Sequence, residues 1–157
     1  MTTPVPGLDG DEEILWRSLV ELLVRLPRVL DDQFHRDARL AMAEYSVLIA
    51  LSEAPVGGLR MGELAEATAL SRSRMSRVVD NLVRRSLVTR RKCDQDGRSL
   101  LAAITAEGRV VLAAAYPGHL TRVRSLVLDH IATSEIHAMM PALSRILAAL
   151  RENAAND

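Results

Sequence analysis

Apolar residues recur every three to four positions along most of the chain, which is the spacing of helices that bury one face. The first such pattern starts at Asp11. Pro27 lies inside it and is expected to kink this helix or end its first part, because proline removes a backbone hydrogen bond. Three shorter helices are predicted over residues 45–54, 62–67 and 71–85.

After Leu87 the pattern changes from helical spacing to short extended runs. Residues 88–92 and 99–104 are predicted as two strands, and the polar stretch CDQDGR between them predicts a β-hairpin with a longer loop. Thr105 is expected to cap a helix that is interrupted or bent near Pro117–Gly118 and reaches about His130. Thr133 is expected to cap a last helix with one apolar stripe: Ile136, Met139, Met140, Leu143, Ile146, Leu147 and Leu150.

The order of these elements predicts a mainly α fold with a small β-hairpin wing. Three short helices and the hairpin outline a winged helix-turn-helix lobe over residues 40–108, within a single domain of residues 11–153. Residues 1–10, which include two prolines and two glycines, are predicted to be a disordered leader. The end helices, residues 11–38 and 120–153, carry more apolar surface than one small lobe covers. We therefore expect them to form a homodimer, chiefly through residues 11–34 and 120–153.

Composition excludes several classes of protein. A single cysteine, Cys93, allows neither an intramolecular disulfide nor a cysteine-based zinc cluster. The amino-terminal stretch MTTPVPGLDGDEE is polar and acidic, unlike a signal peptide, and no apolar run approaches the ~20 residues of a membrane span. We expect a cytoplasmic protein without membrane contact. No nucleophile elbow, P-loop or dinucleotide fingerprint occurs, so neither enzyme activity nor a cofactor is predicted.

Positive charge is concentrated in one segment of a chain whose formal net charge is zero. Residues 72–98 contain nine basic and three acidic residues, a local charge of +6, which leaves −6 for the remainder. Such a block is a typical electrostatic footprint for a polyanion, although a solvated charged surface is the alternative.

The helix predicted over residues 71–85 separates its charge from its apolar face. On a helical wheel Met75, Val79 and Leu82 share the apolar face, and arginines and serines lie opposite or on the flanks. Ser71 is a suitable amino-terminal cap, which directs free N–H groups and the positive end of the helix dipole outward. The predicted contacts to double-stranded DNA here are Ser71, Arg72, Ser73, Arg74, Ser76 and Arg77, with Arg84, Arg85 and Arg90 on phosphates.

The stretches GELAEATALSRSRMSRVVDNLVRRSLVTRR, DGR and ITAEG resemble the MarR family of winged helix-turn-helix transcription regulators. The resemblance implies a homodimeric repressor of its own or adjacent genes, which binds a palindromic operator and is released by a small-molecule effector. It also implies that Arg98 at the wing tip enters the minor groove and that Asp96 orients it. Two departures concern local geometry, since Ala69 stands where the turn usually has glycine and Ala41 where the second helix usually has a Ser or Thr cap.

An effector site is harder to locate from the sequence. Members of the family often bind aromatic or phenolic acids beside the dimerisation helices, and Trp16, His35, Arg39 and Tyr45 offer ring surfaces and a cation there. Packing in the core or the dimer is the alternative for Trp16 and Tyr45.

Two further functions stay open. One is a winged-helix module that binds an acidic protein partner. The other is a metal-responsive member of the same family, although the four histidines show no ligand spacing and no metal ligand is predicted. Cys93 beside Lys92 is interpreted as incidental.

Overall fold

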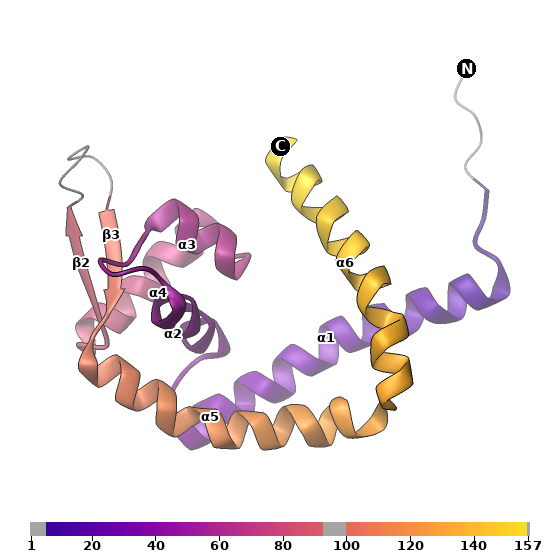
Figure 1. Cartoon of the computed structure of the whole chain (residues 1–157), viewed down its shortest axis with the longest axis horizontal. Coiled ribbons are helices and arrows are strands. Elements are labelled where there is room, and N and C mark those ends of the chain that lie inside the picture. The colour runs from indigo at the N-terminus through magenta and orange to yellow at the C-terminus, as the bar shows by residue number, and fades with distance from the viewer. Residues whose placement is uncertain (1–5, 93–99, 157) are drawn as a thin grey trace. The chain divides into compact units, whose positions relative to one another are not determined.

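The computed structural model describes residues 6–92 and 100–156, which form two compact units with a boundary between His119 and Leu120. The described elements of the first unit are helix α1 (Gly10–Ala38), α2 (Met42–Glu53), strand β1 (Leu59–Arg60), α3 (Met61–Thr68), α4 (Arg72–Arg84), β2 (Val88–Lys92), β3 (Leu100–Ile104) and the larger part of α5 (Ala106–Leu126). Figure 1 shows α2, α3 and α4 gathered beside the β2–β3 hairpin. The predicted mainly α fold with a small hairpin wing is confirmed.

Helix α1 begins at Asp9, whose side chain accepts hydrogen bonds from the backbone N–H groups of Asp11 and Glu12 at 3.0 and 2.9 Å. Glu12 returns a bond to the Asp9 N–H at 3.0 Å, so both ends of a capping box are made. Pro27 does not end the helix, which continues to Ala38. Only the last third of α1 is buried, at Leu30, Gln33 and Phe34.

The core of the first unit lies among α2, α3, α4 and the sheet. Leu48 and Leu51 of α2 meet Leu64 of α3 and the apolar face of α4. These side chains exclude water almost completely, and burial of each is worth about 1.5–3 kcal/mol. The lobe is therefore a rigid base for the exposed face of α4.

The start of α2 is fixed from another helix. Position 41 is alanine and supplies no cap, yet α2 begins at Met42, three residues before the predicted start. The Asp31 carboxylate of α1 accepts the Met42 N–H at 2.7 Å and replaces the missing cap. The other departure, Ala69, adopts the left-handed conformation with φ 53° at the end of α3, so the turn keeps its shape without glycine.

The sheet has three antiparallel strands in the order β1-β3-β2, and β1 was not predicted. Leu59 pairs with Ala102 and Arg60 with Leu101. The preceding Gly58 has φ 93°, and a Cβ there would lie 2.0 Å from the Ala102 carbonyl oxygen. A residue with a side chain would push β1 away from β3 at this point. Ser99, the predicted first residue of β3, lies outside the described residues.

Thr105 connects the sheet to α5 as predicted. Its hydroxyl accepts the Gly108 N–H at 2.9 Å and reaches the Ser86 and Leu87 carbonyl oxygens at 2.8 and 3.0 Å. Helix α5 runs through Pro117 without the predicted interruption and ends at Leu126, and a 3₁₀ turn, η1 (Leu128–His130), follows.

The second unit contains the end of α5, η1 and α6 (Thr133–Asn156). Thr133 is the first residue of α6 and not its cap; the residue before it, Ala132, donates its N–H to Glu135 Oε2 at 2.7 Å. The predicted apolar stripe of α6 is exposed over most of its length. Among the described residues no helix is long and apolar enough to span a membrane.

Replacement of Gly108 by alanine should destabilise the fold, because the added Cβ would lie 2.2 Å from the Leu87 carbonyl oxygen and 2.8 Å from Ile104 Cγ1. We expect a loss of about 1–3 kcal/mol in the free energy of unfolding, the usual cost of overpacking. Gly62→Ala is the matched control, since no atom lies within 4 Å of its added Cβ. It should leave stability unchanged or raise it by up to about 1 kcal/mol. Urea denaturation measures both, and an equal effect of the two would contradict the packing argument.

Candidate nucleic-acid interface

Helix α4 presents two distinct faces. Met75, Val79 and Leu82 are at most 1% exposed and hold the helix against the core. Seven predicted contact residues are exposed: Ser71, Arg72, Ser73, Arg74, Ser76, Arg77 and Arg84. The predicted orientation of the helix is confirmed, with arginines and serines facing solvent.

The amino-terminal end of α4 suits an anion. Ser71 is the cap as predicted, and its hydroxyl accepts the Arg74 N–H at 3.4 Å. The first turn contains no acidic residue. Three arginines within the first six residues of the helix add to the positive end of the dipole, so this end attracts phosphate or electronegative base edges.

Beside α4 an open hollow of about 560 Å³ lies against α3 and the β2–β3 hairpin. Its lining includes Arg72 and Ser76 of α4 and Arg90 of β2, which are predicted contacts. Arg60, which is not among the predicted contacts, also lines it. Glu63 and Glu66 also line it, so its charge is mixed. The hollow joins the exposed face of α4 to the hairpin in one concave surface.

Arg90 is not a freely extended cation. Its Nη1 lies 2.7 Å from Asp80 Oδ1, and its side chain is 31% exposed. This ion pair joins β2 to α4. Asp80, the one acidic residue of α4, therefore stabilises the position of the hairpin. Arg90 still lines the hollow and can contact a phosphate from its braced position.

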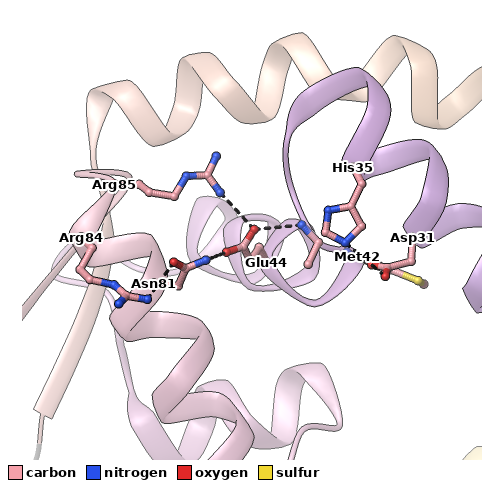
Figure 2. Close-up of polar contacts among 8 residues, drawn as sticks. Asp31, His35, Met42, Glu44, Asn81, Arg84 and Arg85 are labelled. Carbon is pink, nitrogen blue, oxygen red and sulfur yellow. Dashed lines mark hydrogen bonds and ion pairs between the residues drawn. The ribbon is translucent and has the colours of Figure 1, made fainter.

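Arg85 pairs with a carboxylate inside the protein, so the prediction that it contacts phosphate is wrong. Its side chain is half-buried, and Nη1 lies 3.1 Å from Glu44 Oε2 in α2 (Figure 2). The Glu44 side chain is 6% exposed, so the charge of Arg85 is taken up inside the protein. The sequence analysis did not predict a role for Glu44, which lies just before the predicted start of its helix.

Asp96 and Arg98 lie outside the described residues, as does Cys93, so their predicted roles at the wing tip stay predictions. The hairpin strands that lead to the tip are described and pair from Val88–Ile104 to Lys92–Leu100.

The four predicted effector residues do not converge within the first unit. Trp16 is 57% exposed and lies 19 residues before His35 on the same helix, which is about 28 Å at 1.5 Å per residue. His35 and Arg39 are exposed, and His35 lies 3.5 Å from Asp31. Tyr45 alone is buried, at 3% exposure.

Tyr45 belongs to a ring cluster that joins α1, α2 and α5. Its centroid lies 4.3 Å from that of Phe34 and 4.9 Å from that of His119, and Phe34 and His119 stack at 4.9 Å. Three buried polar atoms here have no hydrogen-bond partner within the described part of the chain: Tyr45 OH, His119 Nδ1 and Gln33 Oε1. Burial raises the pKa of Tyr45, helped by Tyr116, and burial lowers the pKa of His119. Native proteins rarely leave several such atoms unsatisfied together.

Metal ligands do not gather in the described part of the chain. Within residues 6–92 and 100–156 no three His, Cys, Asp or Glu side chains lie close enough to hold an ion. His130 Nε2 lies 2.9 Å from the Ser125 carbonyl oxygen, and His137 is exposed on α6.

The described elements define a class of fold. Three helices, with α4 after a short turn from α3, and a three-stranded antiparallel sheet that ends in a hairpin form a winged helix-turn-helix.

Comparison with known proteins identifies the family. A sequence profile of the MarR family matches residues 40–99. The structure of Sco3205, a MarR family transcriptional regulator from Streptomyces coelicolor in complex with DNA, is 34% identical. The match covers 92% of this chain and 94% of that chain with a TM-score of 0.87. This chain belongs to the MarR family of transcription regulators and is not an enzyme.

Two further relatives bear on function. The HTH-type transcriptional repressor YetL of Bacillus subtilis (strain 168) is 25% identical over 129 residues, which cover 82% of this chain and 76% of YetL. The structure of the PcaV transcriptional regulator from Streptomyces coelicolor in complex with its natural ligand is 26% identical, with a TM-score of 0.71. That match covers 93% of this chain and 99% of that chain.

The lowered pKa of His119 gives folding a pH dependence. The unfolded histidine takes up a proton below about pH 6.5, whereas the buried one resists protonation. The neutral ring therefore stabilises the fold above that pH, and this stability is lost as pH falls toward the lower pKa of the folded state. His119→Phe keeps a ring and should show a smaller drop in Tm between about pH 7.5 and 5.5 than the wild type.

Phe34→Leu is the control for this measurement, because it perturbs the same cluster without removing a titratable group. It should lower Tm at both pH values and keep the wild-type difference between them. If His119→Phe also kept that difference, burial of His119 would not contribute to the pH dependence.

Proposed function

We propose that this regulator binds double-stranded DNA in a sequence-specific manner, as a homodimer on a palindromic operator, and represses its own or adjacent genes. The observation that carries this proposal is the outward face of α4, where exposed arginines and serines follow a capped, acid-free amino terminus. Sco3205 was solved with DNA, and YetL is a repressor, which supports both parts of the proposal.

The exposed residues divide by their position along α4. Ser73, Arg74, Ser76 and Arg77 lie in its first half, where a recognition helix meets base edges in the major groove. Ser71 and Arg72 at the helix start, Arg84 at its last turn and Arg90 of β2 contact phosphates and fix the register. Arg98 at the wing tip enters the minor groove and Asp96 orients it.

A homodimer follows from surfaces that each unit leaves uncovered. In the first unit the amino-terminal half of α1 exposes large apolar side chains, among them Leu15, Leu22 and Leu23. In the second unit α6 exposes Met140, Leu147 and Leu150. Patches of this kind are buried in stable proteins, and a two-fold dimer buries the same patch on both copies. A dimer with two recognition helices binds two half-sites about 34–36 Å apart, which explains a palindromic operator.

The effector site is assigned to the ring cluster of Phe34, Tyr45 and His119. It has apolar ring faces, and the unpartnered Tyr45 hydroxyl, His119 Nδ1 and Gln33 Oε1 supply a donor and acceptors. These groups match a phenolic acid, whose ring stacks and whose hydroxyl and carboxylate form hydrogen bonds. The PcaV structure with its natural ligand supports the presence of a ligand site in such a protein. Binding would require the stacked rings to separate and would release the operator.

The DNA-binding proposal is tested on a duplex from the region upstream of the gene itself. Wild type should bind it in preference to a random duplex, with two chains per duplex by sedimentation and a steep fall in affinity with salt. Arg77→Ala should cost about 1–3 kcal/mol on this site and relax the preference at one base pair. Arg84→Ala should weaken all duplexes alike and reduce the salt slope by about 0.9.

Arg36→Ala is the control with the same loss of charge, at an exposed position of α1 outside residues 11–34, and it should change neither property. One chain per duplex would contradict the dimer. Equal affinity for the upstream and random duplexes, with binding to an acidic protein partner, would favour the alternative of a protein-interaction module.

The effector assignment is tested with 4-hydroxybenzoate as a probe. It should release the wild-type protein from the duplex, and Tyr45→Phe should raise the concentration needed by roughly five- to tenfold, the effect of one lost hydrogen bond. Trp16→Phe should leave the concentration unchanged. The opposite result, with Trp16→Phe impaired and Tyr45→Phe normal, would place the effector site elsewhere.

A further inference from the structure

The Glu44 carboxylate is buried, and both of its oxygens accept hydrogen bonds. The residue is 4% exposed, and a charge removed from water is stable only when it is paired and hydrogen-bonded. Three donors meet it: the Ala41 N–H at 2.9 Å, Arg85 Nη1 at 3.1 Å and Asn81 Nδ2. The first of these lies in its own helix, and the other two come from the end of α4.

These contacts join the first turn of α2 to the last turns of the recognition helix. Asn81 lies in α4, and Arg85 is its carboxyl-terminal cap. The pair of Asp80 and Arg90 at 2.7 Å holds the same turns from β2. Among the described residues no ion pair joins the first half of α4 to another element, so the direction of this half depends on the buried apolar face and on the two ion pairs at the other end.

Asn81 continues the contact to the surface. Its amide nitrogen donates to Glu44 Oε1, which fixes the amide plane and leaves its oxygen directed at Arg84. Arg84 Nη2 donates to that oxygen at 3.0 Å, and Figure 2 shows the chain of contacts from Glu44 through Asn81 to Arg84. A long exposed side chain is thereby restrained before any ligand arrives, which lowers the entropy lost on binding.

We propose that Glu44 is a positioning residue for DNA recognition, which fixes the end of α4 and, through Asn81, aims Arg84 at the DNA backbone. Arg85 is the internal counter-charge of Glu44 and contacts no phosphate. This inference rests on the proposed function, since it assigns roles within the same interface.

The roles of Arg84 and Arg85 differ in one measurable property. A phosphate contact releases counterions, so its removal lowers the slope of log affinity against log salt by about 0.9. Arg84→Ala should show this reduction. Arg85→Ala should weaken operator binding with the wild-type slope, and an equal reduction for both variants would overturn the internal role of Arg85.

The relay is tested by a double-mutant cycle on the operator. Asn81→Ala keeps the Glu44–Arg85 pair and should weaken operator binding about threefold or more, with Tm within a few degrees of wild type. Because Asn81 acts through Arg84, the double variant Asn81→Ala/Arg84→Ala should bind no more weakly than Arg84→Ala alone. If the losses of affinity from Asn81→Ala and Arg84→Ala were additive, Asn81 would not act through Arg84. Both variants keep Glu44, so this test does not depend on the folding of a Glu44 variant.

Glu44→Gln removes the charge with little change of shape. It should weaken operator binding about tenfold and random-duplex binding about threefold, because only the aiming of Arg84 at phosphates acts on every sequence, so the ratio of operator to random-duplex affinity should fall about threefold. Glu53→Gln, an exposed position on the same helix, is the matched control and should change neither. A folded Glu44→Gln variant with the wild-type ratio would overturn the proposal. A wild-type protein that bound no duplex would instead overturn the proposed function.

Discussion

The burial of one face of α4 is the constraint on which the candidate interface depends. Met75, Val79 and Leu82 together contribute roughly 5–9 kcal/mol of apolar burial, which is comparable to the whole stability of a small domain. A rotation of the helix by one residue would expose part of this face and bury an arginine. The arginines therefore face solvent because the valine, leucine and methionine side chains cannot.

The same constraint explains how much of the fold the sequence predicts. The six described α-helices and both strands of the hairpin are predicted from the sequence. Helical spacing of apolar residues indicates α1, α4 and α6, and alternation indicates β3, because both patterns record which side of an element is buried. Helix α2 was predicted three residues short since its cap, Asp31, comes from another helix. Strand β1 was missed because two residues show no period, and it exists through pairing with β3 and the conformation of Gly58. Neither Pro27 nor Pro117 ends its helix, and the kink or bend that the sequence predicts as the alternative stays a prediction.

The residues of the candidate site also differ in whether the sequence predicts them. Exposed residues of α4 can be predicted since their opposite face is apolar. Glu44 and Asn81 could not be, because their roles depend on contacts across 37 residues of sequence. An acid at position 44, within the apolar stretch AMAEYSVL, is the one signal the sequence offers, and a buried charge needs a partner. Gln33 and His119 give no signal at all, since a lone polar residue at the edge of a helix is usually solvated.

Glu44 and Tyr45 are neighbours in the first turn of α2, and they face different partners. Glu44 holds the end of α4, whereas Tyr45 packs against Phe34 of α1 and His119 of α5. Met42, at the start of the same turn, is capped by Asp31 of α1. Adjacent residues on a helix cannot shift independently, because the backbone hydrogen bonds of the turn hold them together. A displacement of the Tyr45 backbone would therefore also move Glu44, whose carboxylate contacts Asn81 and Arg85. The first turn of α2 therefore contacts both the ring cluster and the end of α4, and the contact with α4 is made by the buried Glu44 carboxylate.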